Sequence, residues 1–370
     1  MAILLQFVWQ LLSFLFVLSV LVFVHELGHF LVARWCGVKV EEFAFGLPPR
    51  IWGKKYGETT YAINLIPFGG YVKMLGQHDF DADAATEGIT PRHFESKTWW
   101  QKSLILCAGV TMNMILAMVI LSVGYMIGMK PFLPQSPLFA QAIEQQGVGV
   151  HQITADSVAA KAGVVINSKI EKVNDTVITS TDQFKATLDQ VKTTGFTLLL
   201  STEEGEQTVT VPAQSADTVL GIGYGGLATL KNVQLPWYQA IYYGATDSVI
   251  ALKETFLGLG RVVSSIISEG QVGQEVTGPV GIFKITSEVS KDGLIPFMQL
   301  MALLSISLAA MNILPIPALD GGRLLFVWIE ALVGKKRWNK AWEGRIHLVG
   351  MALLLLLMVV ISARDIGKLF

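Results

Sequence analysis

The chain has 370 residues, of which 52% are apolar and only 15% are charged, whereas a typical soluble domain carries about a quarter charged residues. The formal net charge is -1, so the composition gives no reason to expect a nucleic-acid partner. Two cysteines, Cys36 and Cys107, are too few for a disulfide framework, and we predict that both are reduced packing residues.

Four apolar runs approach or exceed the length of about 20 residues that a bilayer-spanning helix needs. They occupy residues 2–24, 104–128, 297–319 and 346–362. The first run lacks a basic n-region and is too long for a signal-peptide h-region, so we expect it to be retained as a helix. These runs predict a polytopic α-helical membrane protein with about four transmembrane helices in a lipid bilayer.

Lys and Arg residues predict the orientation of the helices, because they gather in short cytoplasmic segments. Nine of them fall within residues 31–102, and a second group follows the third apolar run, from Arg323 to Arg345. Both segments are therefore predicted to be cytoplasmic. Four spans then place both termini, and the long stretch 130–296, on the outer side of the membrane.

Between the first two spans the pattern changes to that of strands. Residues 60–65 alternate in polarity, and a second strand-like stretch, 71–75, follows after Gly69 and Gly70. We expect a β-hairpin or small sheet associated with the membrane. Residues 1–128 are thus predicted to combine the first two transmembrane helices with a β element.

The outer stretch predicts a small α+β domain over residues 140–230. Its expected elements are a short helix at 159–162 ending at Gly163, a strand at 170–173, a helix at 181–191, and strands at 197–201 and 207–211. Residues 236–295 are predicted to be an amphipathic interfacial segment, because the aromatic side chains that begin with Trp237 suit a membrane surface. Residues 296–370 contain the last two spans.

The most informative motif is His25-Glu26-Leu27-Gly28-His29, at the end of the first apolar run. Residues four apart share one face of a helix, so both imidazoles can reach one metal ion, beside which Glu26 can take a proton from water. The alternative is a chance match, expected in roughly one protein in a hundred. Ionisable groups ending an uncharged membrane helix are costly, however, and are functional by default. We predict that His25 and His29 bind metal and that Glu26 is the catalytic base.

Catalytic zinc usually has three protein ligands and one open position, so a third ligand is needed. Asp320 ends the third apolar run, and the predicted topology places it at the same membrane depth as the two histidines, toward the cytoplasmic face. We predict that Asp320 is the third ligand. The alternative is a carboxylate that ends a helix without binding metal.

Polar and helix-breaking residues accompany this set. Pro315 and Pro317 lack backbone hydrogen-bond donors and should disrupt the helix just before Asp320. The disrupted backbone either lines a cavity or is an ordinary kink. Asn312 either orients a ligand or holds a substrate backbone, or else it bonds a neighbouring helix. Asn113 has the same two interpretations, and the sequence does not choose between them.

Together these motifs resemble the site-2 protease family of intramembrane zinc metalloproteases (peptidase family M50), of the bacterial regulator of sigma-E protease type. The stretches that carry the resemblance are His25 to His29, Phe68-Gly69-Gly70-Tyr71, Ala108-Gly109 with Asn113, Gly278-Pro279-Val280-Gly281, and Leu319-Asp320-Gly321, while residues 155–175 resemble a PDZ domain. The chain departs from the family in having Val110 where proline is usual, and in having a single PDZ-like module.

The resemblance implies a Zn2+ cofactor and a place in the bacterial cytoplasmic (inner) membrane, with one PDZ-like domain outside. It implies regulated intramembrane proteolysis of transmembrane segments in proteins that another protease has already shortened, such as anti-sigma factors or remnant signal peptides. The residues that would bind an unwound substrate are Gly69, Gly70, Tyr71, Asn312, Pro315 and Pro317. The oligomeric state stays open.

Two other classes of protein compete with the protease. A catalytically inactive membrane scaffold would use the PDZ-like module to recruit partners, but it would be free to lose Glu26. A metal transporter would need polar groups spread through the membrane depth. The first two spans carry no charge along their length, and the polar set gathers at one level.

Overall fold

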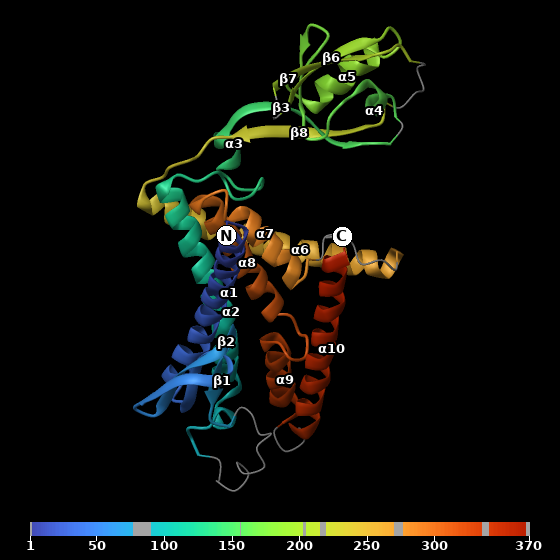
Figure 1. Ribbon diagram of the computed structural model, residues 1–370. Coiled ribbons are helices and arrows are strands. Elements are labelled where there is room, and N and C mark those ends of the chain that lie inside the picture. Colours follow the sequence, from blue (N-terminus) through green and yellow to red (C-terminus); the bar gives the residue numbers. More distant parts are fainter. Residues whose placement is uncertain are drawn as a thin grey trace. The chain divides into compact units, whose positions relative to one another are not determined.

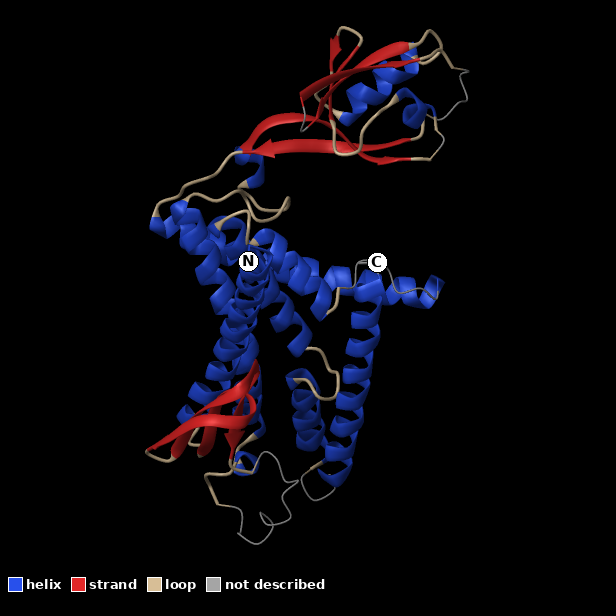
Figure 2. Cartoon of the chain, in the orientation of Figure 1, coloured by secondary structure: helices blue, strands red, loops and turns tan. Residues whose placement is uncertain are grey.

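A computed structural model describes residues 2–76, 90–155, 157–202, 205–214, 220–269, 277–334 and 340–367. The chain separates into two compact units (Figure 1). Unit 1 comprises residues 1–136 and 234–370, and unit 2 comprises residues 137–233. Unit 1 is mainly helical, whereas most of the strands belong to unit 2 (Figure 2).

Unit 1 contains four helices that are long and apolar enough to cross a membrane, counted over the described residues. The elements of the unit, in chain order, are α1 (Ala2–Trp35), β1 (Val40–Tyr56), β2 (Thr59–Met74), a 3-10 turn (Phe94–Ser96), α2 (Trp99–Ile127), α6 (Trp237–Glu269), α7 (Pro279–Val289), α8 (Leu294–Asn312), α9 (Asp320–Val333) and α10 (Lys340–Gly367). The membrane-length helices are α1, α2, α8 and α10, which confirms the predicted number. The start of α1 and the end of α10 lie at the same end of the helical bundle (Figure 1), as an even number of spans requires.

The β element is a small sheet, as expected, and it packs against α1, but its strands are arranged differently. Phe43 of β1 lies opposite Val72 on one side and Tyr61 on the other, so both halves of β2 flank the first half of β1. The predicted turn at Gly69 and Gly70 is wrong, because both glycines lie within β2. They mark the place where β2 passes from one side of β1 to the other. Strand pairing is a long-range property that the local pattern did not reveal.

The third apolar run is not one helix. It ends as a helix at Asn312, and after an irregular segment the chain begins α9 at Asp320. Pro315 and Pro317 cannot donate backbone hydrogen bonds, and Ala318 has a positive φ of 79°, which no helix allows. Asp320 is therefore the first residue of a further helix, rather than the last residue of the third membrane helix.

The same correction applies to the first membrane helix. α1 continues for ten residues beyond His25, to Trp35, which is about 15 Å at the usual helical rise. α9 likewise extends 14 residues from Asp320. His25 and His29 therefore lie inside α1 and not at its end, and Asp320 meets them as the first residue of α9.

A buried ion pair holds α9 against α2. Lys102 Nζ lies 3.0 Å from Glu330 Oε2, and the two side chains are 3% and 9% exposed. Trp328 of α9 also donates from its indole nitrogen to Ser103 Oγ of α2, at 3.1 Å. Since α9 begins with Asp320, these contacts fix the helix that presents the predicted third ligand.

We expect Lys102→Met to destabilise the protein strongly, because it would leave the Glu330 carboxylate buried without its cation. Breaking a buried pair in this way costs about 3–5 kcal/mol, whereas replacing both partners by apolar residues is often neutral. Thermal unfolding in detergent should therefore show a marked drop for Lys102→Met and recovery in the double variant Lys102→Met/Glu330→Leu. A double variant as unstable as the single one would contradict this account.

α6 lies across the bundle at the end where α1 begins (Figure 1). Asp247 on its inner face is fully buried and accepts hydrogen bonds from the Tyr125 hydroxyl of α2 and from Ser136 Oγ. On the outer face Trp237 and Tyr242 are exposed. This helix was expected from its amphipathic pattern, and its contact with a membrane surface stays a prediction.

Unit 2 has its own hydrophobic core under a mainly antiparallel sheet. Its elements are α3 (Phe139–Ala142), β3 (Ile143–Ile153), α4 (Val158–Ala162), β4 (Lys169–Val173), β5 (Thr176–Val177), α5 (Thr181–Val191), β6 (Phe196–Thr202), β7 (Gly205–Val211) and β8 (Ile222–Leu230). The sheet order is β7-β6-β4-β3-β8, with β5 beside β4. Phe184 of α5 is fully buried against Ile170 and Leu198 of the sheet.

The local predictions for unit 2 are confirmed. Gly163 ends α4 in the left-handed conformation, with φ 87°, and the Ser180 side chain caps the start of α5. The expected helices and strands lie within one or two residues of the observed ones. The sheet ends at β8. The PDZ assignment stays a prediction.

Candidate active site

α1 brings the three polar residues of its motif to one region of unit 1. His25 and His29 are one helical turn apart and are only 7% and 6% exposed. Their imidazole rings meet edge to face, with centroids 4.8 Å apart. Glu26 is half-buried and lines the same cavity as both rings.

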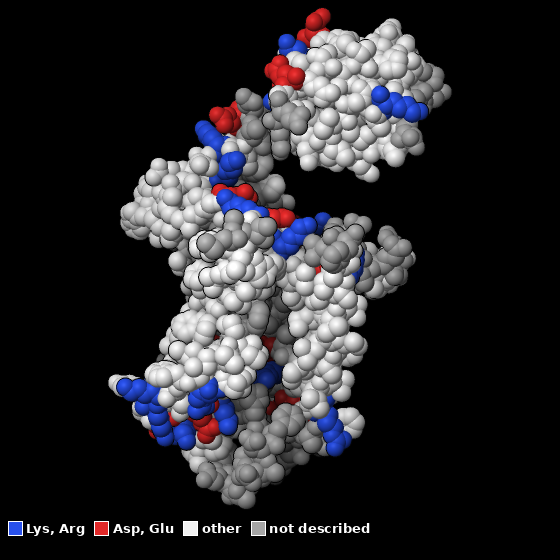
Figure 3. Space-filling model, in the orientation of Figure 1, with Lys and Arg blue, Asp and Glu red and all other residues white. Residues whose placement is uncertain are grey.

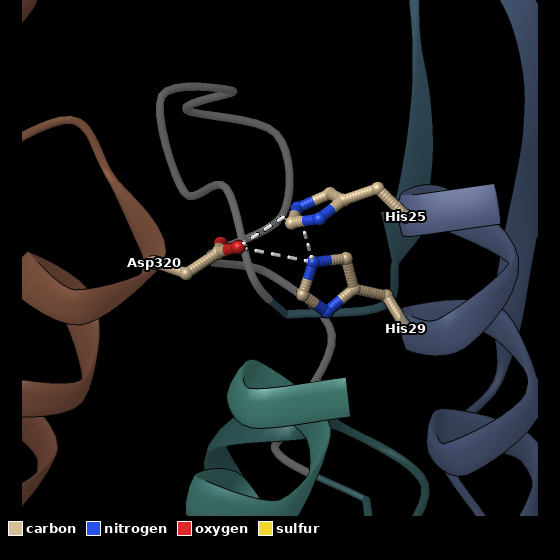
Figure 4. Close-up of side chains that lie close together, drawn as sticks. All are labelled: His25, His29 and Asp320. Atoms are coloured by element: carbon tan, nitrogen blue, oxygen red, sulfur yellow. Dashed lines mark hydrogen bonds and ion pairs between the residues drawn. The ribbon is translucent and has the colours of Figure 1, made fainter. Parts of the chain in front are cut away.

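Asp320 faces the two imidazoles from the start of α9 (Figure 4). Its Oδ2 atom lies 3.0 Å from His25 Nε2 and 3.2 Å from His29 Nε2, and the two Nε2 atoms are 3.2 Å apart. Zinc bound at about 2.0–2.1 Å in tetrahedral geometry would separate such donors by about 3.3 Å. The triangle of one oxygen and two nitrogens therefore fits a zinc ion with only a small expansion.

Neighbouring groups fix the orientation of both rings. His29 Nδ1 lies 2.8 Å from the carbonyl oxygen of Ile105, to which it can donate. The Asn113 amide of α2, fully buried, lies 3.3 Å from His25 Nδ1. When Nε2 binds a metal, Nδ1 carries the proton. A rotation of the Asn113 amide by 180° exchanges Nδ2 and Oδ1, and Oδ1 then accepts a hydrogen bond from the Nδ1–H group of His25. In the described part of the chain Oδ1 otherwise has no partner, which favours an orienting role for Asn113.

The irregular segment before α9 presents Asp320. A Cβ atom on Gly321 or Gly322 would lie 2.2 Å from the carbonyl oxygens of Ile313 or Ile316, so only glycine lets α9 begin this close to the segment. The Ala318 amide donates to Nδ1 of His347 on α10, at 2.9 Å. No local pattern indicated this role of His347, because the contact joins two elements that are far apart in the chain.

A cavity of about 310 Å³ opens at the donor triangle. Its walls include Glu26, Asn312 and Tyr71 from the predicted set, and Asn312 Nδ2 lies 3.5 Å from His25 Nε2. Pro317 lines a different cavity, against α10. Of the remaining predicted residues, Pro315, Gly69 and Gly70 do not line the catalytic cavity, although a Cβ on Gly70 would come within 3.5 Å of Glu26 Cγ.

One edge of the small sheet borders this cavity. Residues 70–74 of β2 pair with 40–45 of β1, and the described part of the chain supplies no strand on their other side. Tyr71, Val72 and Met74 from this edge line the cavity. An extended peptide pairing with the edge would therefore run next to the donor triangle.

Comparison with known proteins decides the family. The model of peptidase family M50 matches residues 13–357. The chain belongs to peptidase family M50. It is 31% identical to the regulator of sigma-W protease RasP of Bacillus subtilis, over 99% of this chain and 100% of that protein.

Other relatives cover the chain equally well. The zinc metalloprotease RasP of Bacillus licheniformis is 30% identical over 97% of this chain and 99% of its own. A Clostridium perfringens protein, provisionally named a zinc metalloprotease, is 33% identical over 94% and 96%. This M50 peptidase is accordingly a zinc metalloendopeptidase of the site-2 protease family and a multi-pass membrane protein. An inactive scaffold or a metal transporter has no comparable support.

Proposed function

We propose that this M50 peptidase hydrolyses transmembrane segments of other membrane proteins at a zinc ion held by His25, His29 and Asp320, with Glu26 as the catalytic base. The observation that carries the proposal is the meeting of three donor atoms, 3.0–3.2 Å apart, beside a cavity in a unit with four membrane-length helices. Ionisable groups in such a setting are costly unless they serve a function.

Each residue has a distinct part in the reaction. Zinc supplies Lewis acidity, which activates a water molecule and polarises the scissile carbonyl group. Glu26 takes a proton from the attacking water and later gives it to the leaving amine nitrogen. Glu26 suits this task because it lines the cavity without belonging to the donor triangle. Ile105 and Asn113 hold the two imidazoles in the orientation that zinc needs.

The substrate must unwind before it can be cut, because the carbonyl groups of a helix are hydrogen-bonded within it. The free edge at residues 70–74 of β2 can accept the unwound segment as an added strand. Asn312 faces the cavity from the end of α8 and can bind the substrate backbone from the other side. Gly69, Gly70, Pro315 and Pro317 then act indirectly, by shaping the strand and the irregular segment.

The proposal extends to the membrane location, orientation and substrates of the enzyme. The enzyme resides in the bacterial cytoplasmic membrane, with its active site toward the cytoplasm and unit 2, as a PDZ-like domain, outside. Its substrates are membrane proteins already shortened by another protease, including membrane-bound anti-sigma factors or remnant signal peptides. The positive charges of segment 31–102 and the name of the Bacillus subtilis relative support these assignments.

Removal of the metal tests the proposal. The purified protein in detergent is incubated with a model substrate that has one apolar span and a short outer tail, and mass spectrometry locates the cuts. We expect 1,10-phenanthroline to reduce cleavage to background and, once the chelator has been removed, one equivalent of zinc to restore it. The isomer 1,7-phenanthroline, which does not chelate, is the matched control. Cleavage that resists chelation, or that occurs only in the soluble tail, would overturn the proposal.

A further inference from the structure

Arg323 is a cation of the catalytic cavity that the reaction scheme above does not use. Arg323 lies on α9 three residues after Asp320, so the two side chains project from the same helix face. It lines the cavity together with Glu26 and both imidazoles. Figure 3 shows basic and acidic atoms in a hollow between uncharged surfaces midway along unit 1.

Arg323 has no evident role in holding the fold together. Over the described residues, the structure shows no hydrogen bond or ion pair for its half-buried guanidinium group, whereas the other charged contact of α9, between Lys102 and Glu330, is tightly paired. A cation near the N-terminus of a helix also opposes the helix dipole. An unpaired positive charge among membrane-length helices is costly, which points to a ligand.

Peptide hydrolysis creates a suitable ligand in this cavity. Water adds to the carbonyl carbon and its proton goes to Glu26, so negative charge moves from Glu26 to the former carbonyl oxygen. The C–N bond then breaks as the nitrogen takes the proton from Glu26. The second proton of the water passes through Glu26 to the amine, which leaves as an ammonium group, and the carbon side leaves as a carboxylate. A guanidinium group is a planar fork of donors that matches carboxylate oxygens in pairs.

We propose that Arg323 forms an anion subsite of the catalytic cavity, which binds the scissile carbonyl oxygen as it becomes negative and then the new carboxylate of the product. This inference rests on the proposed function. An interaction that strengthens only as charge develops accelerates the chemical step, and its loss lowers kcat more than it changes KM. Removing one donor of this kind from other enzymes costs about 100- to 1,000-fold in kcat.

The kinetic test compares Arg323→Gln, Arg323→Lys and the control Arg345→Gln, which alters a second arginine that lines the separate cavity against α10. We expect Arg323→Gln to lower kcat about 100-fold, with KM changed less than about threefold and with wild-type zinc content. Arg323→Lys should restore part of kcat, and Arg345→Gln should match the wild type. An unchanged kcat in Arg323→Gln, or a lowered kcat explained by lost zinc, overturns the subsite.

A binding test removes both zinc and turnover from the measurement. The probe is the amino-terminal cleavage product of the model substrate, made either with its C-terminal carboxylate or as the C-terminal amide, and titrated onto zinc-free protein in detergent. A charge-assisted pair contributes about 1.5–3 kcal/mol, so the acid should bind at least about tenfold more tightly than the amide. Arg323→Gln should abolish this preference, and Arg345→Gln should keep it.

The outcomes separate the two proposals. If the wild type fails to cut within the span of the substrate, the proposed function fails. The chelation experiment shows this failure without any Arg323 variant. If the wild type cuts but Arg323→Gln binds acid and amide with the same ratio as the wild type, only the subsite is refuted. If Arg323→Gln loses affinity for the acid and the amide equally, the residue shapes the cavity and does not bind the carboxylate. That result also refutes the subsite.

Discussion

Glu26→Gln is expected to abolish proteolysis while leaving the metal centre intact. The substitution keeps the size of the side chain and removes its ability to accept a proton. General acid and base catalysis contributes about 100- to 10,000-fold, and here one residue serves in both steps, so we expect a loss at the upper end of that range. Zinc content, measured by elemental analysis, should stay at the wild-type level, because Glu26 does not belong to the donor triangle.

The matched control is Glu254→Gln, which makes the same chemical change on α6, outside the catalytic cavity. It should retain full activity and zinc. Cleavage of the model substrate by Glu26→Gln at the wild-type rate would show that another group takes the proton. Loss of zinc in Glu26→Gln would instead mean that the glutamate supports the metal. Substitution of Glu26 should therefore remove activity and keep the metal, whereas substitution of His25, His29 or Asp320 should remove the metal.

The part of the site that could be predicted from sequence is the part that local spacing and membrane energetics determine. The positions of His25 and His29 follow from the period of a helix, and ionisable groups in apolar runs single out Glu26 and Asp320. The helix at 181–191 was also located correctly, because the residue pattern of a helix is a local feature.

The remainder depends on contacts between distant parts of the chain. The pairing of β1 with both halves of β2 brings Tyr71 and Val72 to the cavity, and no local pattern encodes that pairing. Arg323 was counted in the sequence only as a cytoplasmic charge. Its three-residue spacing from Asp320 becomes meaningful once a helix is known to begin at Asp320. The prolines indicated that the preceding helix is disrupted, but not that a new one follows.

The close contact of α1 with α2 gives the second large effect. An added Cβ on Gly109 of α2 would lie 2.5 Å from His29 Nε2 and 2.6 Å from His25 Cε1. Gly28 is equally constrained from the other helix, since its Cβ would lie 2.4 Å from the carbonyl oxygen of Ala108. Both glycines lie where α1 and α2 cross in close contact. A small shift of one helix along the other therefore does not make room for a methyl group at residue 109.

Gly109→Ala should consequently displace both imidazoles and empty the metal centre. Changes to groups that merely support metal ligands lower metal affinity about 10- to 100-fold, and a methyl group against the donor atoms should exceed that range. Competition with a fluorescent zinc chelator measures the affinity, and Gly258→Ala is the control, because its Cβ would have no atom within 4 Å. Because alanine favours a helix more than glycine does, that control should even stabilise the protein slightly. Wild-type zinc affinity in Gly109→Ala would mean that the imidazoles can rearrange without loss, and that the tight crossing of α1 and α2 does not shape the metal centre.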